Sequence, residues 1–247
     1  MTETEFLQTY DPGDYERPSV AVDLLLMSVV DDAPAILLMR RNEHPALGKW
    51  TLPGGFVRID EALDEAAHRI LREKARMDEA YVEQLYTFGA VERDPRMRVI
   101  SVAYFALLPA ERYAAALKAS AGQLTLARVA VDWPGETGGP AVASGEDGPL
   151  PLAFDHADML GLAMLRLRGK LDYSSVGFAL LPELFSLRQL QSVHEAILGV
   201  QLNKPAFRRR MLDKGWIEPT GEREAGASFR PAELYRFKPL RQTPERT

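Results

Sequence analysis

The spacing of apolar residues predicts two strands and a long helix in the first part of the chain. Residues 19–31 (SVAVDLLLMSVVD) and 35–41 (AILLMRR) are apolar runs separated by a polar turn at 31–34, which predicts a pair of β-strands. Residues 154–171 (FDHADMLGLAMLRLRGKL) have helical spacing, with Asp155 as the candidate cap and Gly169 near the end. These patterns predict an α+β domain.

The last part of the chain has a different order of elements. Residues 185–198 have helical spacing, and Ser186 with Gln189 forms a candidate capping box. After a short turn, residues 203–215 form a second expected helix, with Asn203 as its N-cap and Gly215 as its terminator. Two short strands are expected at 216–218 and 234–237, around a polar hairpin. Helix, turn, basic helix and hairpin is the order of a winged helix-turn-helix domain.

Composition divides the chain into two regions of opposite charge. Residues 1–170 carry 18 basic and 26 acidic residues, a net charge of −8, whereas residues 171–247 carry 12 and 9, a net charge of +3. We therefore expect one domain at 1–170 and a DNA-binding domain at 171–247, with partners of different kinds. Residues 1–15 are polar and predict a mobile arm, and the Gly- and Pro-rich residues 133–150 predict a flexible loop.

Cysteine content and hydropathy exclude several classes of site. The chain has no cysteine, which excludes disulfides, thiolate metal sites and cysteine nucleophiles. No segment is long and apolar enough to predict a membrane span, and no secretory signal begins the chain. We expect a cytoplasmic protein with no membrane partner.

Residues 55–77, GFVRIDEALDEAAHRILREKARM, resemble the Nudix hydrolase signature G-x5-E-x7-R-E-U-x-E-E-x-G-U, where U is aliphatic. Six residues match the signature and three do not: the matches are Gly55, Glu61, Arg69, Leu71, Glu73 and Met77, and the departures are Ile70, Lys74 and Arg76. The resemblance implies a Nudix-type α/β/α sandwich with a mixed sheet.

The departures fall on the residues that would hold a metal ion. In the signature three glutamates share one helix face and bind Mg²⁺. Here the three positions are Ile70, Glu73 and Lys74, so a face expected to carry a charge of −3 is neutral. We therefore expect no catalytic residues in this degenerate box (Glu61, Arg69, Ile70, Glu73, Lys74) and no metal site, with Glu73 as the one remaining ligand. A residual enzyme that recruits Glu61, Asp64 or Glu65 for Mg²⁺ stays open as the alternative.

The whole chain, over about residues 15–240, resembles the Nudix-related transcriptional regulators of bacterial NAD metabolism (the NrtR family). The motifs that match are LPGGFVRIDEALDEAAHRIL, YTFG with DPRMRVISVAY, AFDHADML, and GFALLPELFSLRQLQSVHEAILGVQLNKPAFRRRML. The resemblance implies an ADP-ribose-responsive repressor of NAD-synthesis or salvage genes that requires no cofactor. A winged helix of this kind is expected to bind a palindromic double-stranded operator as a homodimer. The alternative is an active pyrophosphohydrolase for ADP-ribose or a related nucleoside diphosphate derivative.

Two groups of residues are candidates for binding. A diphosphate needs cations and backbone N–H groups in a concave site, and the candidates in and beside the box are Arg40, Arg41, Gly54, Gly55, Arg69, Arg96 and Arg98. Arg41 is equally compatible with a surface ion pair, and Arg69 with a role in orienting Glu73. The DNA-binding candidates are Asn203, Lys204, Arg208, Arg209, Arg210, Arg223 and Arg230, although three consecutive arginines also suit a solvated helix face. Trp50 and Phe56 are candidates for stacking on adenine or for the core, and the histidines show no metal-ligand spacing.

Overall fold

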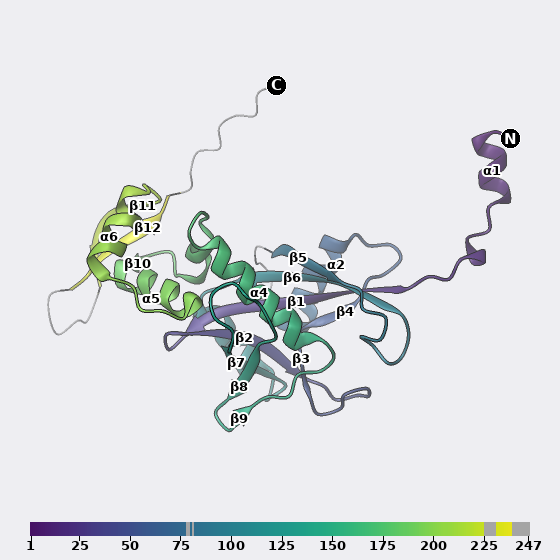
Figure 1. The fold of residues 1–247 in the computed structure, drawn as a ribbon, viewed down its shortest axis with the longest axis horizontal. Coiled ribbons are helices and arrows are strands. Elements are labelled where there is room, and N and C mark those ends of the chain that lie inside the picture. Colours follow the sequence, from purple (N-terminus) through teal and green to yellow (C-terminus); the bar gives the residue numbers. More distant parts are fainter. Residues whose placement is uncertain (78–79, 81, 225–230, 239–247) are drawn as a thin grey trace.

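The protein is built around one mixed β-sheet (Figure 1). The computed structural model describes the chain except residues 78–79, 81, 225–230 and 239–247. Within the described residues the strand order is β5-β6-β1-β2-β7-β8-β9, with β3 on β2 and β4 on β1; β1 and β6 are parallel, and the other neighbours are antiparallel. The strands are β1 Ser19–Val30, β2 Ala33–Arg40, β3 Trp50–Thr51, β4 Gly54–Phe56, β5 Val82–Phe88, β6 Val99–Leu107, β7 Leu124–Ala130, β8 Val142–Gly145 and β9 Gly148–Pro149.

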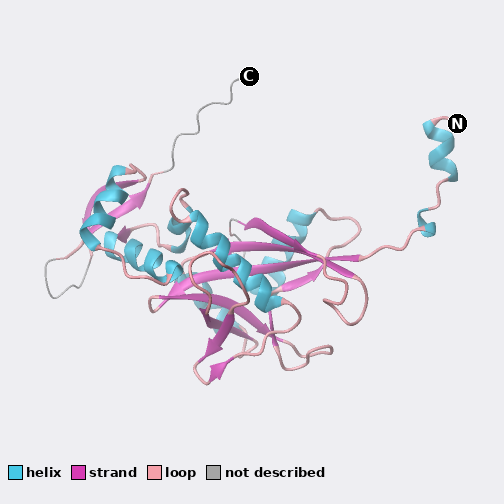
Figure 2. Ribbon diagram, viewed as in Figure 1, coloured by secondary structure: helices cyan, strands magenta, loops and turns pink. Residues whose placement is uncertain are grey.

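Strand β1 is buried on both faces, and its alternating side chains enter two separate hydrophobic clusters. Val22, Leu24 and Leu26 pack on the side of α2 (Leu63–Ala75) and α3 (Ala114–Ala119), together with η2 (Ala110–Tyr113). Leu25 and Met27 pack on the side of α4 (His156–Lys170). Successive side chains of β1 therefore point to opposite faces of the sheet, and each face is covered by helices. This arrangement is the expected α/β/α sandwich (Figure 2).

The C-terminal region has the winged helix-turn-helix order that the sequence predicts. Ser186 and Gln189 form the capping box of α5 (Leu187–Leu198), and Gly199 ends this helix with φ +70°. The Asn203 side chain accepts a hydrogen bond from the Ala206 N–H, 3.0 Å away, at the start of α6 (Lys204–Asp213). The wing strands are β11 (Ile217–Arg223) and β12 (Glu233–Phe237), both longer than predicted, and β12 also pairs with β10 (Phe185–Ser186), which the apolar pattern did not reveal.

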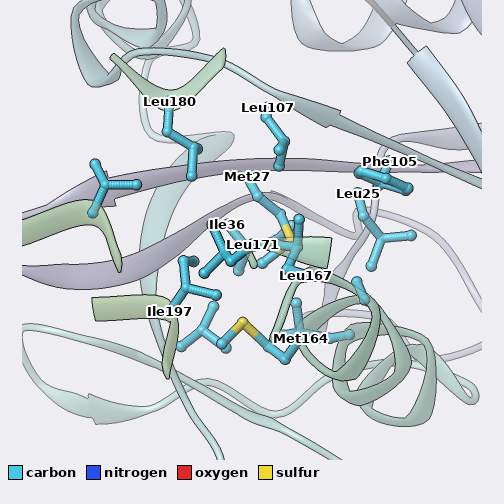
Figure 3. Packing of buried hydrophobic residues seen from close by; sticks show 14 of the residues in the cluster. Leu25, Met27, Ile36, Phe105, Leu107, Met164, Leu167, Leu171, Leu180 and Ile197 are labelled. Carbon is cyan, nitrogen blue, oxygen red and sulfur yellow. The ribbon is translucent and has the colours of Figure 1, made fainter. Parts of the chain in front are cut away.

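A single hydrophobic cluster joins the sheet to the winged helix. It begins with Leu25 and Met27 of β1, continues through Met164 and Leu167 of α4, and reaches Ile197 of α5 (Figure 3). Leu180 belongs to the same cluster and lies in η3 (Val176–Leu180), which connects α4 to β10. The division at residue 170 stays a prediction, because apolar packing is continuous across it.

Two segments expected to lack regular structure contain short elements. Residues 133–150, predicted as a flexible loop, include β8 and β9 at the sheet edge and bury the Trp133 ring. The sequence pattern missed these strands because each is only a few residues long. The N-terminal arm contains α1 (Glu3–Thr9) and η1 (Pro12–Asp14), has no buried residue and stands away from the sheet (Figure 1). Within the described residues, no helix is long and apolar enough to cross a membrane.

Helix α4 touches the backbone of residues 133–150 at one glycine. A Cβ at Gly161 would lie 1.8 Å from the Gly139 carbonyl oxygen, which is far inside van der Waals contact. A Cβ at Gly169, on the same helix, would meet only the Glu136 carboxylate, 3.9 Å away. The close approach therefore requires glycine at 161 but not at 169.

We predict that Gly161→Ala destabilises the protein by more than about 3 kcal/mol, because backbone on both sides would have to move. Gly169→Ala is the matched control, and it should stabilise the protein by about 0.5–1 kcal/mol through helix propensity. Urea unfolding of both variants measures the difference. Equal stability of the two variants would contradict the proposed contact.

Candidate functional site

A cavity of about 450 Å³ lies beside the degenerate box. Its walls come from β1, the end of β2, the β3–β4 turn, residues 93–96 and the start of α4. The residues that line it are Ala21, Asp23, Met39, Arg40, Arg41, Asn42, Glu43, Thr51, Leu52, Gly54, Gly55, Phe56, Lys74, Arg93, Asp94, Arg96, Val99, Phe154 and His156. Five of the seven predicted ligand residues are therefore brought together here: Arg40, Arg41, Gly54, Gly55 and Arg96.

Cations outnumber carboxylates in the lining. It contains five cationic side chains (Arg40, Arg41, Lys74, Arg93, Arg96) and three carboxylates (Asp23, Glu43, Asp94). An excess of positive charge inside a concave, partly apolar wall attracts anions. The cavity is therefore suited to a ligand that carries phosphate groups.

Size alone does not identify this site. Cavities of about 530 and 630 Å³ lie at the junction with the winged helix. The first is walled mainly by apolar groups, including Phe105, Phe178 and Phe237, and the second is an open groove between Asp32 and α5. Neither combines the box loop with a cluster of arginines, so charge and position favour the 450 Å³ cavity.

Two of the arginines are held in place by neighbours on their own loops. The Arg41 Nε donates to the Pro45 carbonyl oxygen at 2.8 Å, and the guanidinium lies 5.1 Å from the Phe154 ring centroid. Arg96 forms a bidentate pair with Asp94 at 3.0 and 2.8 Å and lies over the Phe56 ring. The side-chain hydrogen bond from Arg96 lowers the pKa of Asp94, which keeps this carboxylate charged and the arginine fixed.

The two glycines of β4 allow backbone and side chains to approach closely. A Cβ at Gly54 would lie 2.1 Å from Oδ1 of Asp23, and the other oxygen of this buried carboxylate accepts from Ser101 at 2.5 Å. Gly55 lies over Ile70, whose side-chain atoms come within 3.8 Å of the position of a Cβ. The two glycines thus allow the turn to cover both a buried charge and the box helix.

A buried polar network lies at the base of the cavity, and the sequence prediction missed most of it. Arg93 forms a bidentate pair with Asp155 at 2.9 and 2.7 Å, and its Nη2 is 3.8 Å from Asp23. Asp155 occupies the N-cap position of α4, but its side chain makes no capping hydrogen bond, so the expected cap is instead a partner of Arg93. The charged residues in the segments VERDP, which contains Arg93, and FDHAD, which contains Asp155, were the only available signal in the sequence. Their pairing could not be predicted, because the two residues are 62 positions apart.

His156 is a neutral structural residue of this network. Its Nδ1 accepts from the Leu52 N–H at 3.1 Å and lies 3.1 Å from the Thr51 hydroxyl. Burial lowers the pKa of His156, and the nearby Asp23 opposes this effect. The imidazole therefore ties the β3–β4 turn to the first turn of α4.

Two predicted ligand residues lie outside the cavity. Arg69 pairs with Glu61 and Glu73 and donates to the Phe56 carbonyl oxygen at 3.0 Å. Arg98 donates to the Ala90 carbonyl oxygen at 3.0 Å. Arg69 thus has the orienting position that the sequence left open as its alternative.

The residues of the box do not fit a divalent cation. Ile70 is fully buried in the core, Lys74 faces the cavity, and Glu73 pairs with Arg58 and Arg69. The other carboxylates are also engaged: Glu61 by Arg69, Asp64 by the Tyr104 hydroxyl, and Glu65 by the Ala62 N–H. In the described part of the chain, no three Asp, Glu, His or Cys side chains converge as a metal site.

The basic residues of the winged helix point in several directions. Phe207 and Met211 form the buried stripe of α6, and Arg208 and Arg209 are exposed. Lys204 and Arg208 line a small cavity against the wing strand β12, whereas Arg210 pairs with Asp172 at 3.3 Å on the opposite flank. Arg223 donates to the Pro231 carbonyl oxygen within the hairpin at 3.0 Å, and Arg230 lies outside the described residues.

Lys214 extends the flank that carries Arg210. Its Nζ donates to the Asp172 carbonyl oxygen at 2.5 Å and lies 4.3 Å from the Trp216 ring centroid. Burial, with Arg210 nearby, lowers the pKa of Lys214. Sequence reasoning missed this lysine and Asp172, because their contact crosses from the end of α4 to the end of α6.

We predict that the Glu61–Arg69 pair stabilises the fold in a pH-dependent way. The hydrogen bond from Arg69 lowers the pKa of Glu61 from its ordinary 4.5 to about 2. The contribution is therefore complete above pH 4.5 and is lost as the pH falls toward 2. Glu61→Gln should lower Tm at pH 7, and the difference from the wild type should shrink between pH 4.5 and pH 3.

The control for this prediction is Glu92→Gln, which neutralises an exposed carboxylate. Its Tm should follow the wild type at every pH. A Glu61→Gln deficit that is constant from pH 7 to pH 3 would show that lost packing, and not the ion pair, explains the effect.

Comparison with known proteins matches both regions of the chain. A NUDIX domain model matches residues 18–121, and a model described as the NrtR DNA-binding winged helix domain matches residues 177–237. A protein of Acinetobacter baylyi named "ADPR responsive transcriptional repressor NtrR" is 39% identical over 238 residues, which is 96% of this chain and 88% of the relative.

Solved structures agree with these matches. NrtR of Shewanella oneidensis complexed with a 27mer DNA has a TM-score of 0.73 and 33% identity, and the match covers 89% of this chain and 93% of that chain. The NUDIX domain of the same protein complexed with ADP ribose has a TM-score of 0.51 and 31% identity over 68% of this chain and 99% of that one. With both regions matched in one continuous alignment, the chain belongs to the NrtR family of Nudix-related transcriptional regulators.

Proposed function

We propose that this protein is an ADP-ribose-responsive transcriptional repressor whose degenerate Nudix domain is the sensor. The observation that carries the proposal is a cavity beside the box that is lined by five cations and has a lysine where a metal ligand is expected. Such a site binds a diphosphate through direct ion pairs and does not need a bridging Mg²⁺. The relatives named for ADP-ribose and for DNA support the same pair of partners.

Effector binding in this cavity follows from its charges. The diphosphate is expected between Arg41 and Arg96, whose guanidinium groups are already fixed, and near the backbone of Gly54 and Gly55. Phe56, which is 41% exposed, remains available beside the cavity, whereas Trp50 packs against the core. Of the two aromatic candidates for adenine stacking, Phe56 is therefore the better one.

Catalysis is not part of this function. Hydrolysis of a diphosphate by a Nudix site needs a bound metal to activate water and stabilise the leaving phosphate. Ile70 and Lys74 remove two ligands, and Lys74 adds positive charge at the cavity. The residues of the box therefore argue against the hydrolase alternative, and Mg²⁺ is needed only if hydrolysis persists.

The output of the sensor is DNA binding by α6 and the wing. The recognition helix would enter the major groove with Arg208 and Arg209, and the hairpin would contact backbone phosphates. A homodimer would present two such helices to half-sites of a palindromic operator, about one helical turn (~34 Å) apart. The family resemblance extends the proposal to genes of NAD synthesis or salvage and to a protein of the bacterial cytoplasm.

We predict that Arg96→Ala weakens ADP-ribose binding about ten- to 150-fold, because a charge-assisted contact contributes roughly 1.5–3 kcal/mol. Arg72→Ala removes an exposed arginine on the outer face of α2 and should bind like the wild type. Calorimetric titration measures both affinities. The same samples are assayed for AMP release from ADP-ribose in the presence of Mg²⁺ or Mn²⁺. Robust turnover would show that the protein is a hydrolase and would overturn the proposal that its Nudix domain acts only as a sensor.

We also predict that Arg208→Ala and Arg209→Ala weaken operator binding. Loss of a phosphate contact should reduce the slope of log K against log salt by about one and affect all sequences alike. Loss of a base contact should cost roughly 1–3 kcal/mol at a single operator position. Fluorescence anisotropy at several salt concentrations separates these outcomes, and a double variant with wild-type affinity would exclude α6 as the recognition helix.

A further inference from the structure

Helix α4 connects the cavity to the recognition helix, and an aspartate lies just outside each of its ends. Asp155 precedes the helix at the cavity, and Asp172 follows it beside α6. The helix crosses one face of the sheet between the two sites (Figure 1). Each aspartate pairs with an arginine near a surface where the proposed function expects phosphate.

At the first end, Arg93 belongs to both the cavity and the helix. Its side chain is only 5% exposed and lines the cavity, with Nη2 3.8 Å from the Asp23 carboxylate in the wall. Its bidentate pair with Asp155 holds the start of α4 in place. A phosphate offers a guanidinium the same geometry as a carboxylate does. A diphosphate in the cavity therefore competes with Asp155 for Arg93.

At the second end, Asp172 contacts one cation within α6 and one at its C-cap. The carboxylate accepts from Arg210 at 3.3 Å, and the backbone carbonyl accepts from Lys214 at 2.5 Å. Arg168, one turn earlier, donates to the Ile197 carbonyl oxygen at 3.0 Å and so fixes the end of α5. The end of α4 is thus attached to both helices of the helix-turn-helix, and Asp172 occupies cations that DNA phosphates attract.

We propose that the two aspartates are internal substitutes for phosphate: Asp155 for the effector at Arg93, and Asp172 for the operator at Arg210. This inference rests on the proposed function and assigns Arg93 as a residue that binds the effector and Asp155 as the positioning residue that holds Arg93 in its absence. When the effector draws Arg93 away, the start of α4 loses its bidentate partner. The rigid helix then carries the change to Asp172 and α6, which gives the two ligands the differential contacts that coupling requires.

The first test uses Asp155→Asn, which keeps the shape of the side chain and removes the competing charge. ADP-ribose affinity should rise roughly ten-fold, because Arg93 is free for the diphosphate. At the same time, the ratio of operator Kd values with and without ADP-ribose should fall toward one. Asp158→Asn is the control: it removes the same charge from an exposed position in the first turn of α4 and should leave both quantities unchanged.

The second test uses Asp172→Asn, at an exposed position where a loss of folding is not expected. Operator affinity in the absence of effector should rise about two- to five-fold, and the salt slope should steepen by about one, because Arg210 becomes available to DNA. Asp213→Asn removes the same charge at an exposed position of α6 without releasing Arg210. A steeper slope in both variants, or in neither, would overturn the assignment of Asp172.

The wild type separates failure of the inference from failure of the proposed function. If ADP-ribose does not change operator affinity in the wild type, the sensor proposal itself is wrong. If the wild type responds and Asp155→Asn responds equally, with unchanged ADP-ribose affinity, the function stands and the role of α4 as the connection is overturned. Thermal unfolding of each variant before titration establishes that the compared proteins are folded.

Discussion

Burial of one face of α4 is the interaction on which the arrangement of the two regions depends. Met164 and Leu167 fill the space between β1 of the sheet and Ile197 of α5. Removing apolar surface from water contributes roughly 25 cal/mol per Å², so a continuous cluster resists independent movement of the winged helix. The close contact of Gly161 with residues 133–150 further limits how this helix lies on the sheet. Movement of the DNA-binding region is therefore expected to involve α4 and not a free linker.

Polar contacts fix the position of α4 along its axis, which apolar packing alone does not determine. Packing fixes the height of α4 on the sheet but is non-directional, whereas the bidentate Arg93–Asp155 pair and the bonds of His156 fix its position along its axis. Most of these groups are buried, so each needs a partner of defined geometry. Some residues that line the cavity, such as Arg93 and His156, also hold α4 in position. A change in how the cavity binds its ligand is therefore expected to change the position of α4.

The sequence was informative wherever local chemistry determines structure. Capping residues such as Ser186 and Asn203 marked the starts of α5 and α6, and the apolar runs located β1 and β2. It was less informative where structure depends on pairs distant in the chain. Aspartate is a residue type that commonly caps helices, and Asp155 occupies the N-cap position of α4. Its carboxylate nevertheless pairs with Arg93, because a buried guanidinium is a stronger partner than a backbone N–H. The same limit explains why Arg98 was grouped with Arg96, although only Arg96 lines the cavity and Arg98 donates to the Ala90 carbonyl oxygen.

Ile70 stands where the Nudix signature has a metal-binding glutamate, and in this protein its side chain is part of the hydrophobic core. Its side chain is fully buried against the β3–β4 turn and belongs to the cluster that supports α2. A carboxylate at this position would enter an apolar environment, where an unpaired charge is strongly unfavourable. A glutamate introduced at position 70 would therefore destabilise the fold before it could contribute to a metal site.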